Sequence, residues 1–141
     1  YATSSISFTS AIQLLEVRSK AMQESMPVGT GGMAAIIGKS MQEVEDLLTL
    51  VGDHGQIFIA NDNADGQIVV SGEMSAINYL CDNSKVLGVK RALKLPVSAP
   101  FHCDLIHSAS QELSKVINEH EFKEFSYEYS KRKRKFRIAC F

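Results

Sequence analysis

The first apolar pattern of the chain has helical spacing. It predicts a helix over residues 8–26, which ends before Pro27 because proline cannot continue a helix. One stripe of this helix carries Ala11, Leu15, Arg18 and Met22. The stripe therefore predicts one buried side of the helix and places an arginine within it. A glycine-rich connector over residues 28–32 follows.

Strand-like and helix-like patterns then alternate. Apolar runs rich in isoleucine and valine predict strands over residues 33–37, 56–60, 67–71 and 91–95. A capping box from Ser40 to Glu43 opens one helix, whose apolar face comprises Met41, Val44, Leu48 and Val51. Asp65-Gly66 predicts a hairpin turn between the second and third strands. A second helix is predicted over residues 74–87, stopped by Gly88.

The order from residue 33 to residue 95 is thus βαββαβ, the ferredoxin-like arrangement, in which two helices cover one face of an antiparallel sheet. A further helix is predicted after His102, to about residue 120, with Ala109, Leu113 and Val116 on its face. The first and last helices do not belong to the ferredoxin-like unit. We therefore expect a mixed α/β (α+β) fold in which this small unit is inserted into something larger.

Composition and charge fit a globular protein. The chain has 141 residues, of which 45% are hydrophobic and 22% charged, enough for one core. The net charge of −1 hides an asymmetry, because six of the fifteen basic residues lie between Lys131 and Arg137. Outside that tail, nine basic residues face sixteen acidic ones, a net charge of −7. An acidic body argues against a nucleic-acid-binding fold.

The cysteines and the hydropathy indicate a compartment. Cys81, Cys103 and Cys140 are an odd count without metal-ligand spacing, which favours reduced thiols in the cytoplasm and no metal site. No apolar run is long enough to span a membrane, and no signal peptide is visible.

His102 is the first candidate for chemistry. It follows Pro100, which fixes one backbone angle and keeps the preceding residue extended, and it precedes an amphipathic helix. Histidine is the side chain best suited to move a proton near neutral pH, so His102 is a candidate general base. The alternative is a partly buried histidine satisfied near a helix N-terminus.

Arg18 is the second candidate, because it lies on an apolar stripe where a leucine is expected. A guanidinium there needs a partner or a wet cleft, and its planar fork can hold a carboxylate through two parallel hydrogen bonds. The alternative is an arginine at the edge of the stripe, with its head group in water.

Several motifs together resemble malonyl-CoA:acyl carrier protein transacylases. The matching segments are Phe8-Thr9-Ser10-Ala11, Val17 to Glu24, Gly32 to Gly38, Ala60 to Asn63, Gly66 to Gly72 and Leu95 to Asp104. The resemblance runs from about Ile6 to about His120, in order, and corresponds to a middle portion of the enzyme. It implies a hydrolase-like α/β domain (residues 1–31 and 96–122) around a ferredoxin-like subdomain (residues 32–95). Residues 123–141 diverge, and we expect this basic tail to be disordered.

The resemblance also implies a ping-pong acyl transfer for fatty acid biosynthesis. A serine attacks the thioester of malonyl-CoA, a histidine accepts its proton, and the phosphopantetheine thiol of acyl carrier protein collects the malonyl group. His102 matches the catalytic base and Arg18 matches the arginine that pairs with the malonyl carboxylate. No cofactor is implied beyond the coenzyme A and phosphopantetheine that the substrates carry.

Four further substrate-binding residues follow from the same resemblance. Met22 and Phe101 belong to the matching motifs, and an aromatic residue before the histidine accompanies malonyl rather than bulkier branched units in related acyltransferases. Asn61 and Asn63 match an asparagine pair at the edge of the substrate cleft. An equal alternative for the asparagines is that they bond the backbone of a turn.

The nucleophile is missing from these residues. The Gly-His-Ser-Leu-Gly elbow of the family is absent, and no serine present replaces it. Cys103 is rejected as a nucleophile because neighbouring residues on a helix do not face each other. We therefore expect little activity from this chain alone, and a complementary polypeptide is one source of the serine.

Two other functions compete with the transferase. A ferredoxin-like unit can be a non-catalytic binding or scaffold module, because fold does not fix function. Its RNA-binding version is disfavoured, since the central strands offer only Phe58 for base stacking. The tail from Lys131 to Arg137 could bind nucleic acid or direct localisation, but a solvated end is the simpler interpretation.

Overall fold

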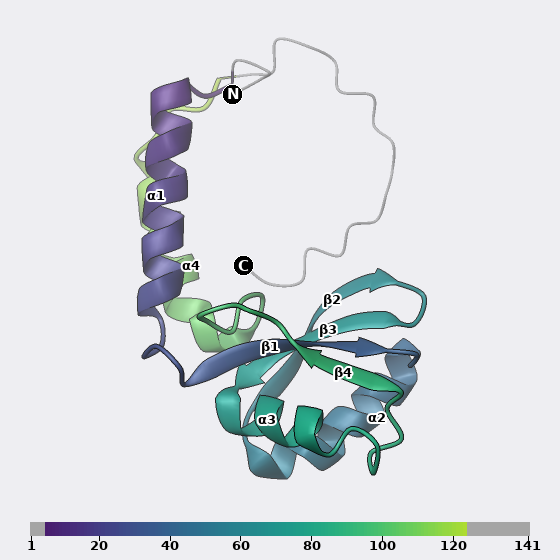
Figure 1. The fold of residues 1–141 in the computed structure, drawn as a ribbon. Helices are drawn as coiled ribbons and strands as arrows, with labels where there is room; N and C mark the ends of the chain where they lie inside the picture. The colour runs from purple at the N-terminus through teal and green to yellow at the C-terminus, as the bar shows by residue number, and fades with distance from the viewer. Residues whose placement is uncertain (1–4, 124–141) are drawn as a thin grey trace.

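The computed structural model describes residues 5–123, so Cys140 and the basic tail lie outside the described residues. The chain forms a sheet with two helices on one face, and a pair of helices that stands beside it (Figure 1). The helices are α1 (Phe8–Glu24), α2 (Met41–Val51), α3 (Met74–Asp82) and α4 (His107–Asn118). The strands are β1 (Gly31–Ile37), β2 (Ile57–Ala64), β3 (Gln67–Glu73) and β4 (Arg91–Lys94).

The sheet has the topology that the sequence predicts. Its strand order is β2-β3-β1-β4, and every neighbouring pair is antiparallel. Helix α2 therefore connects β1 to β2, and helix α3 connects β3 to β4. In each case the two connected strands are parallel and a third strand lies between them, which is the split βαβ of ferredoxin-like folds. The predicted hairpin is present as well, because residues 65–66 form the turn between β2 and β3.

One face of the sheet and both of its helices share the main core. The face is made by alternate residues of β1 and β3, because successive side chains of a strand point to opposite sides. Ala34, Ile36, Ile68 and Val70 supply it, and Val44, Leu47, Val51, Ala76, Ile77 and Leu80 supply the helices. Met41 and Leu48 are only partly buried against this cluster. The predicted apolar face of α2 is thus confirmed, with Leu47 added to it.

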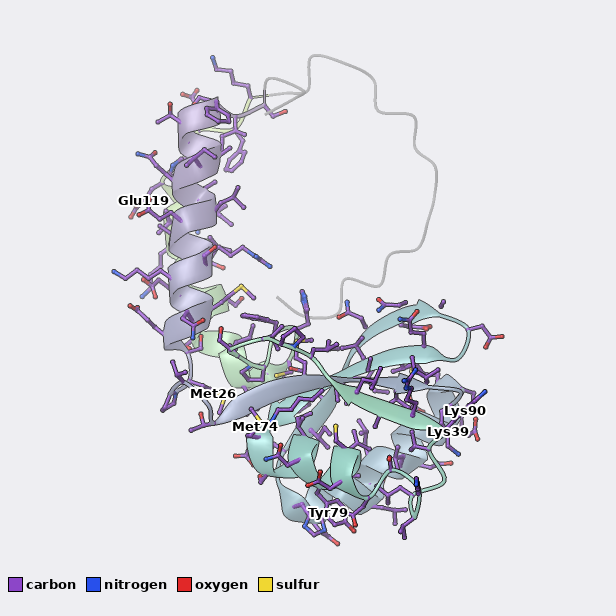
Figure 2. The ribbon with its side chains drawn as sticks, in the orientation of Figure 1. Met26, Lys39, Met74, Tyr79, Lys90 and Glu119 are labelled. Atoms are coloured by element: carbon purple, nitrogen blue, oxygen red, sulfur yellow. The ribbon has the colours of Figure 1, made fainter. Side chains whose placement is uncertain are left out.

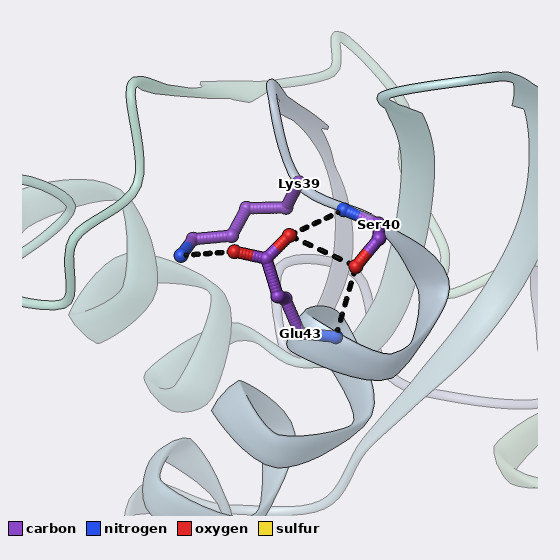
Figure 3. A network of polar contacts seen from close by, with 3 residues as sticks. All are labelled: Lys39, Ser40 and Glu43. Atoms are coloured by element: carbon purple, nitrogen blue, oxygen red, sulfur yellow. Dashed lines mark hydrogen bonds and ion pairs between the residues drawn. The ribbon is translucent and has the colours of Figure 1, made fainter.

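The start of α2 is held by the predicted capping box (Figure 3). The Ser40 hydroxyl accepts from the Glu43 backbone N–H at 3.4 Å, and a Glu43 carboxylate oxygen accepts from the Ser40 N–H at 2.8 Å. Lys39 donates to the other carboxylate oxygen at 3.1 Å. These bonds, first that from the Ser40 backbone, lower the pKa of Glu43 to about 2.

Most boundaries shift by a residue or two, and three differences bear on the fold. Helix α3 ends at Asp82 rather than near Leu87, where Asn83 leaves the helical backbone angles (φ −102°, ψ 13°) and its side chain bonds the carbonyl of Tyr79. Strand β2 continues four residues beyond residue 60, to Ala64, through two register shifts. Strand β1 begins at Gly31, so the last two glycines of the predicted connector belong to the sheet.

Helices α1 and α4 lie antiparallel, side by side, and extend away from the sheet (Figure 1). Their buried contact lies toward the sheet end, where Ala21 and Met22 of α1 meet Ala109 of α4. Farther along α1, Phe8, Ile12 and Leu15 are 60%, 47% and 56% exposed. The predicted burial of the α1 stripe is therefore correct at Met22 and wrong at Leu15. Among the described residues, no helix is long and apolar enough to cross a membrane.

Candidate functional site

The corner that precedes His102 is pressed against the first strand. Pro100 is fully buried, and the backbone of Gly31 lies directly beneath its ring. A Cβ atom added at Gly31 would meet Pro100 Cδ at 2.5 Å and Cγ at 2.6 Å, far inside van der Waals contact. Figure 2 labels Met74, which donates its backbone N–H to Thr30 at 2.8 Å and so lies at the same end of β1. Lys39 and Lys90 mark the opposite end of the sheet (Figure 2).

His102 has an unusual backbone conformation. Its φ is +61°, and among the described residues it is the one non-glycine with positive φ. Such a conformation is uncommon for a residue with a Cβ atom, although histidine adopts it more readily than most. The side chain is exposed and has no hydrogen bond to a described residue, so the ring is free to face a bound molecule. A partly buried histidine, the alternative from the sequence, is not what the structure shows.

Phe101 joins the corner to the rest of the molecule. It packs against the second face of the sheet, through a cluster of Met33, Ala35, Ala60 and Val69. It also packs against the α1–α4 contact, which contains Met22. The residue before His102 therefore bridges the sheet and the helix pair, and the structure brings Phe101 and Met22 into one apolar cluster.

Arg18 precedes Met22 by one helical turn, so both side chains leave the same side of α1. The side chain of Arg18 is half-buried. Within residues 5–123, no carboxylate lies within ion-pair distance of its guanidinium. Arg18 therefore shares a side of α1 with Met22, and it has no charged partner in the described part of the chain.

The two asparagines lie on β2, beside the bulges of that strand. Asn61 is opposite Val69 in the register, so it shares the sheet face on which Phe101 packs. Asn61 is half-buried and Asn63 is exposed. Neither side chain bonds a described backbone group, so the described structure does not show the turn-bonding role that was the alternative.

Two buried groups near this corner, the Cys103 thiol and the Ser71 hydroxyl, are not placed to act as nucleophiles. The Cys103 thiol donates to the carbonyl of Pro100 at 3.1 Å, and burial raises the pKa of Cys103 above its usual value. A raised pKa lowers the thiolate fraction, which agrees with rejecting this cysteine as a nucleophile. The Ser71 hydroxyl, on β3, is fully buried, and its interaction with the Cys103 thiol lowers the pKa of that thiol, against the larger effect of burial.

Sequence patterns gave no sign of two contacts that hold this region. The Ser98 hydroxyl donates to the Gln23 side-chain oxygen at 2.5 Å, across 75 positions of the chain. The Ser108 hydroxyl donates to that of Ser25 at 3.3 Å, and so ties the start of α4 to the end of α1. Neither pair belongs to a local motif, because each joins segments that only the fold brings together.

Two other features lie elsewhere. A shallow recess is lined by Ser5, Ile6, Ser7, Phe8, Ser10, Glu121 and Lys123, at the end of α1 remote from the sheet. No group of three or more His, Cys, Asp or Glu side chains within residues 5–123 is placed to hold a metal ion.

The comparisons with known proteins agree on one family. A malonyl CoA-acyl carrier protein transacylase of Staphylococcus aureus (strain COL) is 36% identical over 123 residues, which are 86% of this chain and 40% of the relative. An acyl-carrier-protein S-malonyltransferase structure from Burkholderia pseudomallei superposes with a TM-score of 0.81 at 38% identity, over 89% of this chain and 41% of that one.

A third match is a malonyl-transacylase in complex with a type II polyketide synthase acyl-carrier protein, with a TM-score of 0.81, 38% identity, and coverage of 89% of this chain and 40% of that one. No family model matches. The resemblance to malonyl-CoA:acyl carrier protein transacylases is confirmed over most of the chain. The chain spans about 40% of the length of these relatives.

Proposed function

We propose that this chain forms the part of a malonyl-CoA:acyl carrier protein transacylase that supplies the general base and the carboxylate-binding arginine. The observation that carries the proposal is the position of Phe101. It adjoins His102 in sequence and packs against the cluster that contains Met22, one turn from Arg18. Phe101 thus connects the segment that carries His102 to the helix that carries Arg18, which supports assigning both side chains to one acyl site.

His102 is the proton carrier in this proposal. A serine hydroxyl supplied from outside these 141 residues attacks the thioester carbon, and the His102 ring accepts the hydroxyl proton. When the carbon–sulfur bond breaks, the same proton goes to the thiol of coenzyme A. In the second half-reaction, His102 accepts the proton of the phosphopantetheine thiol and returns it to the serine. Base catalysis of this kind contributes about 10²–10⁴-fold in rate.

Arg18 recognises the free carboxylate of the malonyl group. A guanidinium donates two parallel N–H hydrogen bonds to a carboxylate. An acetyl group cannot accept this pair of bonds because it has no free carboxylate. A hydrogen bond to a charged group contributes about 1.5–3 kcal/mol, which corresponds to about tenfold to a hundredfold in affinity. The absence of a described carboxylate partner leaves Arg18 available for this role.

The remaining residues shape the acyl site. Phe101 and Met22 form its apolar wall, and a ring at position 101 leaves no room for the extra methyl of a branched unit. Asn61 and Asn63 line the edge of the cleft from β2, the strand whose Ala60 packs in the same cluster as Phe101. No resident cofactor takes part, because the substrates carry coenzyme A and phosphopantetheine, and the setting is the cytoplasm.

The rest of the catalytic machinery lies beyond these residues. The 141 residues contain no Gly-His-Ser-Leu-Gly sequence, and the relatives are about two and a half times as long as the matched region. The apolar side chains that α1 exposes, Ile12 and Leu15, are the surface on which the missing portion packs. That portion carries the serine, either in the same polypeptide or in a complementary one.

Calorimetry on the chain tests the carboxylate site. Malonyl-CoA should bind about tenfold to a hundredfold more tightly than acetyl-CoA, and Arg18→Met should remove the difference. Lys20→Met is the matched control, because Lys20 is an exposed cation two residues away on the same helix. Equal affinity for the two esters would contradict the assignment. Tight binding of an amino acid or a nucleotide instead would favour the binding-module alternative.

A transfer assay with malonyl-CoA and acyl carrier protein tests the location of the nucleophile. The chain alone should give no turnover above background, because only binding and positioning remain when a nucleophile is absent. Turnover by the 141 residues alone would place a nucleophile among them and contradict this part of the proposal.

A further inference from the structure

We propose that Gly31, Pro100 and the Gln23–Ser98 hydrogen bond act as a clamp that fixes the direction of the His102 ring. None of these residues carries chemistry of its own, so they are positioning residues. The inference rests on the proposed function only for what His102 does, and not for where it points.

The need for a clamp follows from the backbone of His102. A φ of +61° is unfavourable for a residue with a Cβ atom, and such a conformation persists only where the surrounding structure leaves no alternative. The side chain of His102 does not supply this constraint on the backbone, because it is exposed and has no hydrogen bond to a described residue. The constraint must therefore come from the residues on either side of it.

Three contacts supply that constraint. On the side of the sheet, the buried ring of Pro100 packs against Gly31 of β1, where even a methyl group would not fit. On the helix side, the Ser98 hydroxyl donates to Gln23 at 2.5 Å, which ties the corner to the end of α1. After the histidine, the Cys103 thiol donates back to the Pro100 carbonyl at 3.1 Å. The chain is held at residues 98, 100 and 103, with His102 between the last two.

This clamp also links the two candidate catalytic groups. Gln23 adjoins Met22 on α1, the helix that carries Arg18, and Ser98 leads into the corner that carries His102. One hydrogen bond thus sets the corner relative to the helix. Gly31 sets the distance between Pro100 and β1, because any side chain at position 31 must push the Pro100 ring away from the strand.

Nuclear magnetic resonance of the histidine rings in the full 141-residue chain tests the clamp directly. Gly31→Ala should shift the assigned ring resonance of His102, because its Cβ would lie 2.5 Å from Pro100 Cδ. Gly52→Ala is the matched control, since Gly52 has φ of −59° and no heavy atom within 4 Å of the added Cβ. The His120 resonance, from the far end of α4, is the internal reference.

A second pair of variants keeps the test decisive if Gly31→Ala does not fold. Ser98→Ala removes the hydrogen bond to Gln23 without adding bulk, and it should shift the His102 resonance. Ser98→Thr keeps the hydroxyl and should restore the wild-type position. Ser19→Ala, which removes an exposed hydroxyl bonded to Leu15 on α1, should leave the resonance unchanged.

The outcomes separate this inference from the proposed function. An unchanged His102 resonance in folded Ser98→Ala, or equal shifts in the Gly52→Ala and Ser19→Ala controls, would overturn the clamp. Shifts confined to the clamp variants would support it, whether or not His102 proves to be the base. Loss of the catalytic role alone would be seen in a transfer assay on the chain mixed with the remaining part of a relative, and not in these spectra.

Discussion

The ferredoxin-like unit and the α1–α4 pair differ in how much of their apolar surface is buried. In the unit, α2 and α3 bury their apolar faces against one sheet face, with Val44, Ile77 and Leu80 fully inside. In the pair, Ala21, Met22, Ala109 and Leu113 are buried, whereas Phe8, Ile12 and Leu15 remain 47–60% exposed. The first region therefore buries most of its apolar surface, whereas the second leaves apolar side chains of α1 exposed.

The candidate site lies where these two regions meet. Phe101 packs against both, Arg18 belongs to the exposed helix, and Asn61 belongs to the sheet. The stable unit therefore provides a fixed base for the corner that carries His102. The helix pair carries Arg18 and exposes the apolar side chains of Phe8, Ile12 and Leu15.

Core truncation should separate the two regions most strongly. Leu80→Ala removes a fully buried side chain between α3 and the sheet, so the free energy of unfolding should fall by about 2–5 kcal/mol. Leu15→Ala is the matched control on α1, where 56% of the side chain is exposed, and it should change that energy by less than about 0.5 kcal/mol. Denaturant unfolding measures both variants. Equal losses would mean that α1 is as well packed as α3.

Hydrogen exchange should sharpen the same comparison within one molecule. Amides of β1 and β3 lie in the centre of the sheet, so they should exchange only through global unfolding. Amides in the first half of α1 should exchange at least about tenfold faster, because few buried contacts oppose local opening there. Mass spectrometry of peptic peptides resolves the two segments. Similar protection in both would contradict the view that few buried contacts hold the first half of α1.

The capping box gives the smallest expected effect, and it is pH-dependent. The folded-state pKa of Glu43 is about 2, below its ordinary value of 4.5, so the ionised carboxylate stabilises the folded state. That contribution should be complete above pH 4.5 and should vanish as the pH falls toward 2. The unfolding free energies of the wild type and Glu43→Gln, measured across this range, should therefore converge on acidification. A difference that is constant with pH would contradict the role of the charge.

How much the sequence predicts depends on the distance over which a contact acts. The capping box from Ser40 to Glu43 and the turn at residues 65–66 are local, and both are present as predicted. The predicted end of α3 was wrong because periodicity does not show that Asn83 leaves the helical backbone angles and bonds the Tyr79 carbonyl through its side chain. The predicted burial of Leu15 was wrong because periodicity shows which side of a helix is apolar and does not show what covers that side.

The candidate site divides in the same way. Arg18 and His102 stand out in the sequence because a cation interrupts an apolar stripe and an imidazole follows a proline. The contacts that hold the corner, Ser98 with Gln23 and Pro100 with Gly31, join residues about 70 positions apart or more and share no motif. Chemistry-bearing residues can thus be proposed from type and spacing, whereas the residues that position them are visible only in the fold.

The role of His102 is tested most directly by reconstitution. The chain is mixed with a polypeptide that carries the remaining part of the Staphylococcus aureus relative, and transfer of malonyl groups to acyl carrier protein is measured. Turnover should appear only in the mixture, and His102→Ala should lower it by about 10²–10⁴-fold while His120→Ala leaves it unchanged. Turnover in the mixture that survives His102→Ala undiminished would contradict the assignment of the general base.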